Sequence, residues 1–135
     1  MAENPRPLVV VWAGPIVGII APLVFWASAA AARLSWAFVL RFFAGFCLVA
    51  NGLYIGVGSL DRVGDCDVML RHGSAPWQLR LFGTLTVPVG LWLWHGQGRH
   101  FGFGSSGGQV DRRVAFGALV VCIMLLTLGV IVGGR

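Results

Sequence analysis

The stretch that decides the fold is Leu8–Ala32, LVVVWAGPIVGIIAPLVFWASAAAA, which contains about 25 residues and no charge. At 1.5 Å of rise per residue, a helix of this length exceeds the roughly 30 Å hydrocarbon core of a bilayer. We therefore predict a membrane-spanning helix here. A secretory signal is the weaker interpretation, because the stretch is too long for the apolar part of a signal and the segment before it is not basic.

Three further apolar runs predict three further spans. They lie near 37–60, 79–95 and 114–133. The second run carries Arg41 close enough to its start for the guanidinium to reach the headgroups. The third is short, with Trp77 before it and Trp94 near its end, as at the two interfaces of a membrane. The sequence therefore predicts an all-α integral membrane bundle of about four transmembrane helices, with residues 1–135 forming a single domain.

The composition agrees with a membrane protein and argues against other classes. Hydrophobic residues make up 57% of the chain and charged residues 11%, too apolar for one water-soluble core of this length. The net charge of +5 comes from scattered arginines, which do not form the basic stripe of a nucleic-acid-binding protein. Three cysteines without C-x-x-C spacing indicate neither a disulfide framework nor a cysteine zinc site. We expect a multi-pass membrane protein, and the nearly equal numbers of arginines on the two sides of the predicted spans do not decide its orientation.

The connections between the spans follow from the remaining residues. Arg33–Trp36 predicts a tight turn and an antiparallel pair of helices, and 96–110 is a Gly/Ser-rich loop. The polar connection 61–78 carries three of the five acids. Within it, Arg71-His72-Gly73 resembles a helix C-terminus, and Ser74-Ala75-Pro76 is suited to begin the next helix.

The first span contains the motif Ala13-Gly14-Pro15. Proline removes a backbone hydrogen bond, and glycine allows a neighbouring backbone to approach closely. A seam of small residues, Gly14, Gly18 and Ala21, is therefore expected to pack on another helix. The simplest interpretation is a kinked helix packed on its neighbour.

The second span contains Asn51, whose amide should face the bundle interior, either as a helix-helix hydrogen bond or as part of a polar site. The glycines of Asn51–Gly58 predict irregular backbone near the membrane surface. Asp65 and Asp67 follow this glycine-rich exit. Their carboxylates are suited to bind a metal, or else they are solvated and pair with nearby arginines.

Taken in order, these segments resemble the carboxy-terminal portion of site-2-type intramembrane zinc metalloproteases, the M50 peptidases, in particular the short M50B-like members. Ala13-Gly14-Pro15 is similar to the family's A-G-P-type motif, and Asn51 with Gly64–Leu70 resembles the helix that carries the asparagine and the Gly/Asp metal-ligand motif. The sequence departs from the common L-D-G-G form, and Leu53 stands where the family usually has proline. The family's first helix, with H-E-x-x-H, is not found in this sequence.

The resemblance implies a zinc ion held by two histidines and one aspartate, with the glutamate of H-E-x-x-H as general base. Here it implies a counterpart only for the aspartate, Asp65 or alternatively Asp67, with Asn51, Gly14 and Pro15 lining the site. It thus assigns no catalytic residue, and it implies no cofactor for the chain as it stands and zinc only if an H-E-x-x-H segment completes it. We expect either that the gene start is placed too late or that the chain is a degenerate or split member that docks onto a second membrane chain.

Two other functions are compatible with the same residues. A non-enzymatic four-helix assembly subunit would use its glycine-rich seams to bind a partner, with Asp61, Asp65 and Asp67 merely solvated. A small transporter is less well supported, because no Asp or Glu lies inside a predicted span to carry a proton or cation.

Overall fold

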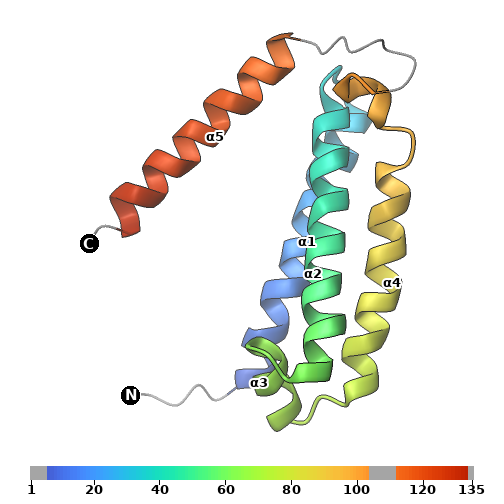
Figure 1. Cartoon of the computed structure of the whole chain (residues 1–135), viewed down its shortest axis with the longest axis vertical. Helices are drawn as coiled ribbons and strands as arrows, with labels where there is room; N and C mark the ends of the chain where they lie inside the picture. The colour runs from blue at the N-terminus through green and yellow to red at the C-terminus, as the bar shows by residue number, and fades with distance from the viewer. Residues whose placement is uncertain (1–5, 104–111, 134–135) are drawn as a thin grey trace. The chain divides into compact units, whose positions relative to one another are not determined.

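The computed structural model describes residues 6–103 and 112–133, and within these ranges every regular element is a helix. The chain divides into two compact units at His95 and Gly96. The first unit, shown in Figure 1, contains α1 (Pro7–Ala31), α2 (Ala37–Asp61), α3 (Asp65–Arg71) and α4 (Pro76–Trp94). The second contains the 3-10 helix η1 (Gly98–Phe101) and α5 (Arg112–Gly133). The predicted all-α class is confirmed.

Helices α1 and α2 are long and apolar enough to cross a membrane, judged by length and composition. They form the predicted antiparallel pair, joined by a turn in which Arg33 takes a left-handed conformation with φ 54°. Helices α4 and α5 fall within a few residues of the predicted third and fourth spans, and that they cross a membrane stays a prediction. Of the predicted Gly/Ser-rich loop 96–110, residues 96–103 are described and contain η1, and residues 104–110 lie outside the described residues.

Helix α2 packs on α4 along a seam of glycines. A Cβ built on Gly83 would lie 2.7 Å from the carbonyl oxygen of Gly52, and one on Gly90 would lie 2.7 Å from the carbonyl oxygen of Gly45. Such distances mean that the two backbones touch, the close approach that small residues permit between membrane helices. The irregular backbone predicted for Asn51–Gly58 is therefore wrong: α2 stays helical to Asp61, and its glycines serve packing.

The predicted polar loop 61–78 contains a short helix, α3, which folds back on the end of α2. Its buried residues Cys66 and Met69 join Ile55 of α2 and Leu79 of α4 in one core cluster. Helix α3 ends at Arg71, and Gly73 follows with φ 103°, as the sequence predicted.

Helix α4 begins at Pro76, the position that the sequence indicated. The residue before it, Ala75, donates its backbone N–H to Oε1 of Gln78 at 2.8 Å. The predicted capping serine, Ser74, has a different role, because its hydroxyl accepts a hydrogen bond from Trp12 of α1.

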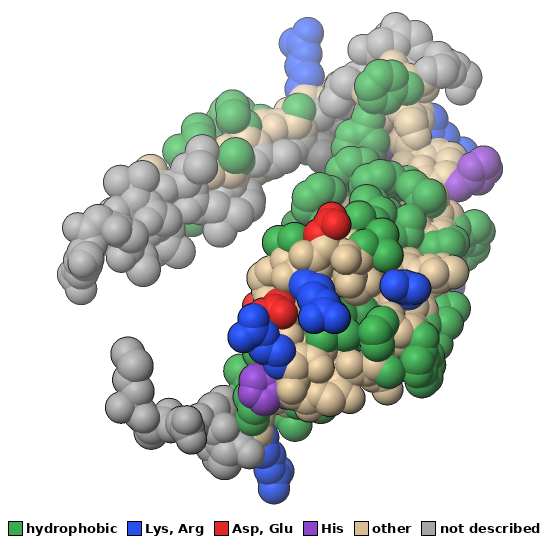
Figure 2. Space-filling model, turned by 60° about the horizontal axis from the view of Figure 1, so that its bottom comes forward, with side chains coloured by type: hydrophobic (Ala, Val, Ile, Leu, Met, Phe, Trp, Pro, Cys, Tyr) green, Lys and Arg blue, Asp and Glu red, His purple; other side chains and the backbone are tan. Residues whose placement is uncertain are grey.

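The outer surface of the first unit is apolar on its flanks and charged at one end. Val9, Phe25 and Trp92 are each more than 60% exposed. Large apolar side chains are more stable in hydrocarbon than in water. Figure 2, in which the α3 end comes forward, shows arginine and aspartate side chains gathered on this end and apolar side chains around it. This distribution suits a bundle whose α3 end lies at a membrane surface.

Candidate functional site

Asp65, the predicted metal ligand, is the first residue of α3 and is exposed. Its backbone N–H donates to the hydroxyl of Tyr54 on α2 at 3.3 Å. Gly64, with φ 55°, makes this contact possible, because a Cβ there would lie 2.5 Å from the Tyr54 oxygen. The Asp65 carboxylate pairs with no arginine or histidine among the described residues. The backbone of Asp65 is thus fixed while its side chain is open to solvent.

Asp67, the alternative ligand, has a partner within its own helix. Its Oδ2 lies 2.7 Å from a guanidinium nitrogen of Arg71, one turn later in α3. This is the arginine pairing that the sequence allowed for a solvated acid, and it makes Asp67 the less available of the two carboxylates. The spacing of four residues is the one at which opposite charges meet on a helix.

Asn51 faces α1, as an interior amide should. A Cβ built on Gly18 would lie 3.1 Å from its Nδ2, so the amide packs directly on the glycine. Its hydrogen bond stays within α2, however, where Nδ2 donates to the carbonyl oxygen of Cys47 at 2.8 Å. Asn51 therefore makes no helix-helix hydrogen bond among the described residues, and its place in a polar site stays a prediction.

The motif Ala13-Gly14-Pro15 is split between two faces of α1. Pro15 is buried, together with Pro22 and Ala29 at intervals of seven residues, whereas Gly14 is exposed. A Cβ built on Gly14 would meet no atom within 4 Å. The seam toward α2 thus passes through Pro15 and Gly18, and the predicted contact at Gly14 is not made within this unit.

The described residues contain no group of three or more His, Cys, Asp or Glu side chains able to hold one metal ion. A zinc site in an enzyme takes three protein ligands, and a structural zinc site takes four. The exposed carboxylate of Asp65, as a single ligand, therefore cannot form a zinc site without further ligands. Its assignment as one ligand of a shared site stays a prediction.

Sequence reasoning missed the two tryptophans that join helices. Trp12 of α1 donates its Nε1–H to the Ser74 hydroxyl at 2.9 Å and packs edge-on against Phe82 of α4, with ring centroids 5.7 Å apart. Near the other end, Trp94 donates to the carbonyl oxygen of Phe42 at 2.9 Å and stacks on its ring. The signal available in the sequence was that Trp12 lies near the start of the first apolar run and Trp94 near the end of the third.

Cys66 is the most enclosed titratable group at the α3 end. Its side chain is fully buried, and its sulfur lies 3.6 Å from the carbonyl oxygens of Tyr54 and Ile55. Burial raises the pKa of the Cys66 thiol above its ordinary value, and the negative charge of Asp65 raises it further. A thiol in this state packs as a small hydrophobic group rather than as a nucleophile or metal ligand.

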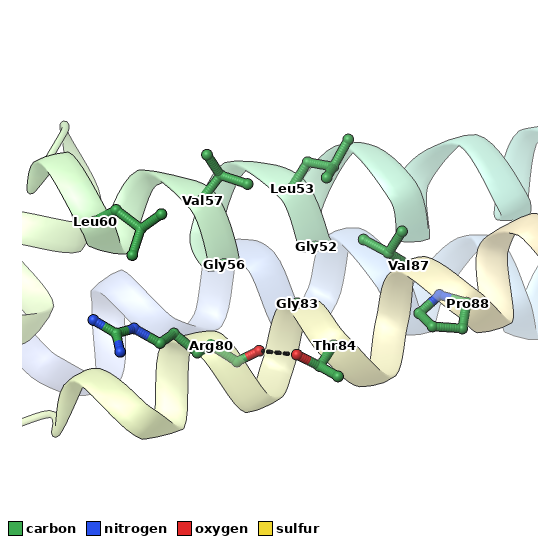
Figure 3. A pocket seen from close by; sticks show the side chains of 10 residues that line it. All are labelled: Gly52, Leu53, Gly56, Val57, Leu60, Arg80, Gly83, Thr84, Val87 and Pro88. Carbon is green, nitrogen blue, oxygen red and sulfur yellow. Dashed lines mark hydrogen bonds between the residues drawn. The ribbon is translucent and has the colours of Figure 1, made fainter.

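The α2/α4 groove, a shallow apolar channel beside the glycine seam, has a volume of about 470 Å³. Figure 3 shows Gly52, Gly56 and Gly83 beneath the side chains of the two helices, with Arg80 near Leu60. No sequence pattern indicates this groove, because the groove depends on which helices pair.

No protein-family profile, no curated protein and no solved structure matches this chain.

Proposed function

We propose that this chain is a multi-pass membrane protein that forms the carboxy-terminal part of a site-2-type zinc-metalloprotease-like fold, and that it does not hydrolyse peptides by itself. The observation that carries this proposal is the packing of residues adjacent to its two diagnostic segments at the α3 end of the bundle. Trp12, directly before Ala13-Gly14-Pro15, packs on the cluster that contains Cys66, the residue after Asp65. About 50 residues of sequence lie between Pro15 and Asp65.

The surroundings of Asp65 and Gly14 support the interpretation that this chain carries only part of a metal site. Asp65 is exposed without an ion-pair partner among the described residues, and Gly14 has open space around it. Both features leave room for a further helix carrying the missing ligands. One carboxylate cannot hold zinc against water, so hydrolysis requires a segment that supplies the histidines and the general base.

The two apolar helices α1 and α2 support the proposed membrane placement, and we extend it to α4 and α5. Helix α4 has 19 residues and is therefore about 28 Å long, close to the thickness of the hydrocarbon core. The exposed apolar flanks of the first unit support the same placement. The proposed location is the cell membrane of a bacterium, with several passes.

The test begins with the reading frame upstream of Met1. An in-frame H-E-x-x-H within about a hundred residues, the length of a few membrane helices, supports the proposal. The longer product, purified in detergent, should then hold zinc in stoichiometric amount and lose it in Asp65→Ala. Asp67→Ala is the matched control and should keep the metal. Zinc bound tightly by the present chain alone, or kept by Asp65→Ala, contradicts the proposal.

A non-enzymatic assembly subunit is the second candidate. The observation that favours it is the position of Asp65 at the start of α3, where a carboxylate is stabilised by the helix dipole and needs no metal. On this alternative Asp65→Ala leaves zinc content and every membrane complex of the chain unchanged. The same variant therefore separates the two candidates.

A further inference from the structure

We propose that the α2/α4 groove binds an anionic phospholipid, with an acyl chain along the glycine seam and the headgroup phosphate on Arg80. This inference rests on the membrane placement proposed above. It does not depend on the zinc half-site, because the groove and Asp65 are separate features.

The shape of the groove follows from its glycines. Gly52, Gly56 and Gly83 have no side chains, so the two helices close until their backbones touch and the surface beside the seam stays hollow. Leu53 and Val57 border it on α2 and are about half exposed. The result is a continuous apolar channel that faces outward, where lipid would lie.

Of the polar side chains that line the groove, Arg80 is the one available to bind a charged ligand. The Thr84 hydroxyl donates to the carbonyl oxygen of Arg80 at 2.8 Å and is thereby satisfied within α4. Among the described residues that line the groove, Arg80 alone is charged. Its side chain is exposed, and no carboxylate among the described residues pairs with it. A guanidinium left free in this way is suited to bind a phosphate in bidentate fashion.

The depth of the groove agrees with a lipid leaflet. Figure 3 shows the Arg80 side chain extending toward Leu60, near the end of α2, and the groove running from there to Pro88. Eight residues of α4 separate Arg80 from Pro88, a rise of about 12 Å, within the roughly 15 Å of hydrocarbon in one leaflet. Trp77, one turn before Arg80, is 62% exposed, as interfacial tryptophans are. The cation thus lies at headgroup depth and the channel at acyl depth.

The experiment compares lipid retention by native mass spectrometry. The full chain is extracted from vesicles of equal parts phosphatidylglycerol and phosphatidylcholine with identical acyl chains. We expect the chain to retain phosphatidylglycerol preferentially, and Arg80→Gln to reduce this preference about fivefold, the value of one arginine at an anionic surface. Arg62→Gln, an arginine at the same end that does not line the groove, should leave the preference unchanged.

A second variant tests the channel itself. Val57→Trp fills the groove from an exposed position without altering the core, and it should lower retention of both lipids. Equal retention of both lipids by the unaltered chain overturns the proposal, as does an equal effect of Arg62→Gln or a dimer that Val57→Trp abolishes. A chain that alkaline carbonate extracts from vesicles overturns the membrane placement itself. An inserted chain without lipid preference overturns the lipid site alone.

Discussion

At the scale of single residues, the glycines of this chain fall into two classes that the sequence does not distinguish. Gly83 touches the backbone of α2 so closely that an added Cβ would lie 2.8 Å from the Cα of Gly56. Gly14 has nothing within 4 Å of the same added atom. The space around Gly83 and Gly14 differs because only Gly83 lies where two helices pair. Substitutions at these two glycines therefore form a matched test.

We predict that Gly83→Ala destabilises the first unit by about 1–3 kcal/mol, because the obstructing atoms are backbone and cannot rotate away. Gly14→Ala should be neutral or stabilise α1 by up to about 1 kcal/mol, since alanine is the better helix former and the space is open. Unfolding of both variants in detergent micelles, followed by circular dichroism, measures the difference. Equal effects of the two variants would show that α2 and α4 do not touch along the glycine seam.

A second prediction concerns the indole of Trp12. Trp12→Phe keeps an aromatic ring against Phe82 but removes the donor to Ser74, and it should cost about 0.5–1.5 kcal/mol of stability. Trp77→Phe is the control, because that indole is exposed and donates no hydrogen bond to another described residue. The same unfolding measurement applies. No loss in Trp12→Phe would mean that water replaces the bond to Ser74 at no cost.

At the scale of elements, α3 is where sequence and structure differ most. Apolar runs predicted the long helices closely, since length and hydrophobicity alone determine them. Helix α3 has seven residues, three of them charged, so no apolar run revealed it. Its stability depends on Cys66 and Met69 entering a cluster with Ile55 and Leu79. Such a contact between distant segments is not encoded in any local pattern, and for the same reason the position of Asp65 was not predictable.

The docking of α3 can be followed through the Cys66 thiol. With Cys47→Ala and Cys122→Ala as background, maleimide should label Cys66 far more slowly in the folded chain than in the unfolded one, because the thiol is buried and its pKa is raised. Tyr54→Phe removes the acceptor for the Asp65 N–H and should speed labelling. Fast labelling of the unaltered chain would contradict the docked position of α3.

The raised pKa of the Cys66 thiol also predicts how the stability of the fold depends on pH. A raised pKa means that the folded state holds the Cys66 proton more tightly than the unfolded state. Its contribution to stability is therefore present below the ordinary thiol value of 9.0 and is lost as the pH rises above it. In the double-alanine background, Cys66→Ala should remove this alkaline decline in stability. A decline that persists unchanged must come from other groups.

At the scale of the whole molecule, four spans predict that both ends of the chain lie on one side of the membrane. Single cysteines placed at Ala2 and at Gly134, in a background without the native cysteines, should be labelled by a membrane-impermeant reagent from the same side. Labelling from opposite sides would show that one of the proposed spans does not cross. The result separates an even number of spans, such as the four proposed, from an odd number; α1 and α2 alone would also place both ends on one side.

The glycine seam between α2 and α4 also has a consequence for biosynthesis. On the proposed membrane placement, α2 is synthesised before α4, so its glycine face enters the translocon before the helix that will cover it. During that interval, any small-residue helix already in the bilayer competes for the same face. The short interval between Asp61 and Pro76 limits this exposure. Lengthening that segment would therefore harm the yield of correctly assembled protein more than the strength of the finished fold.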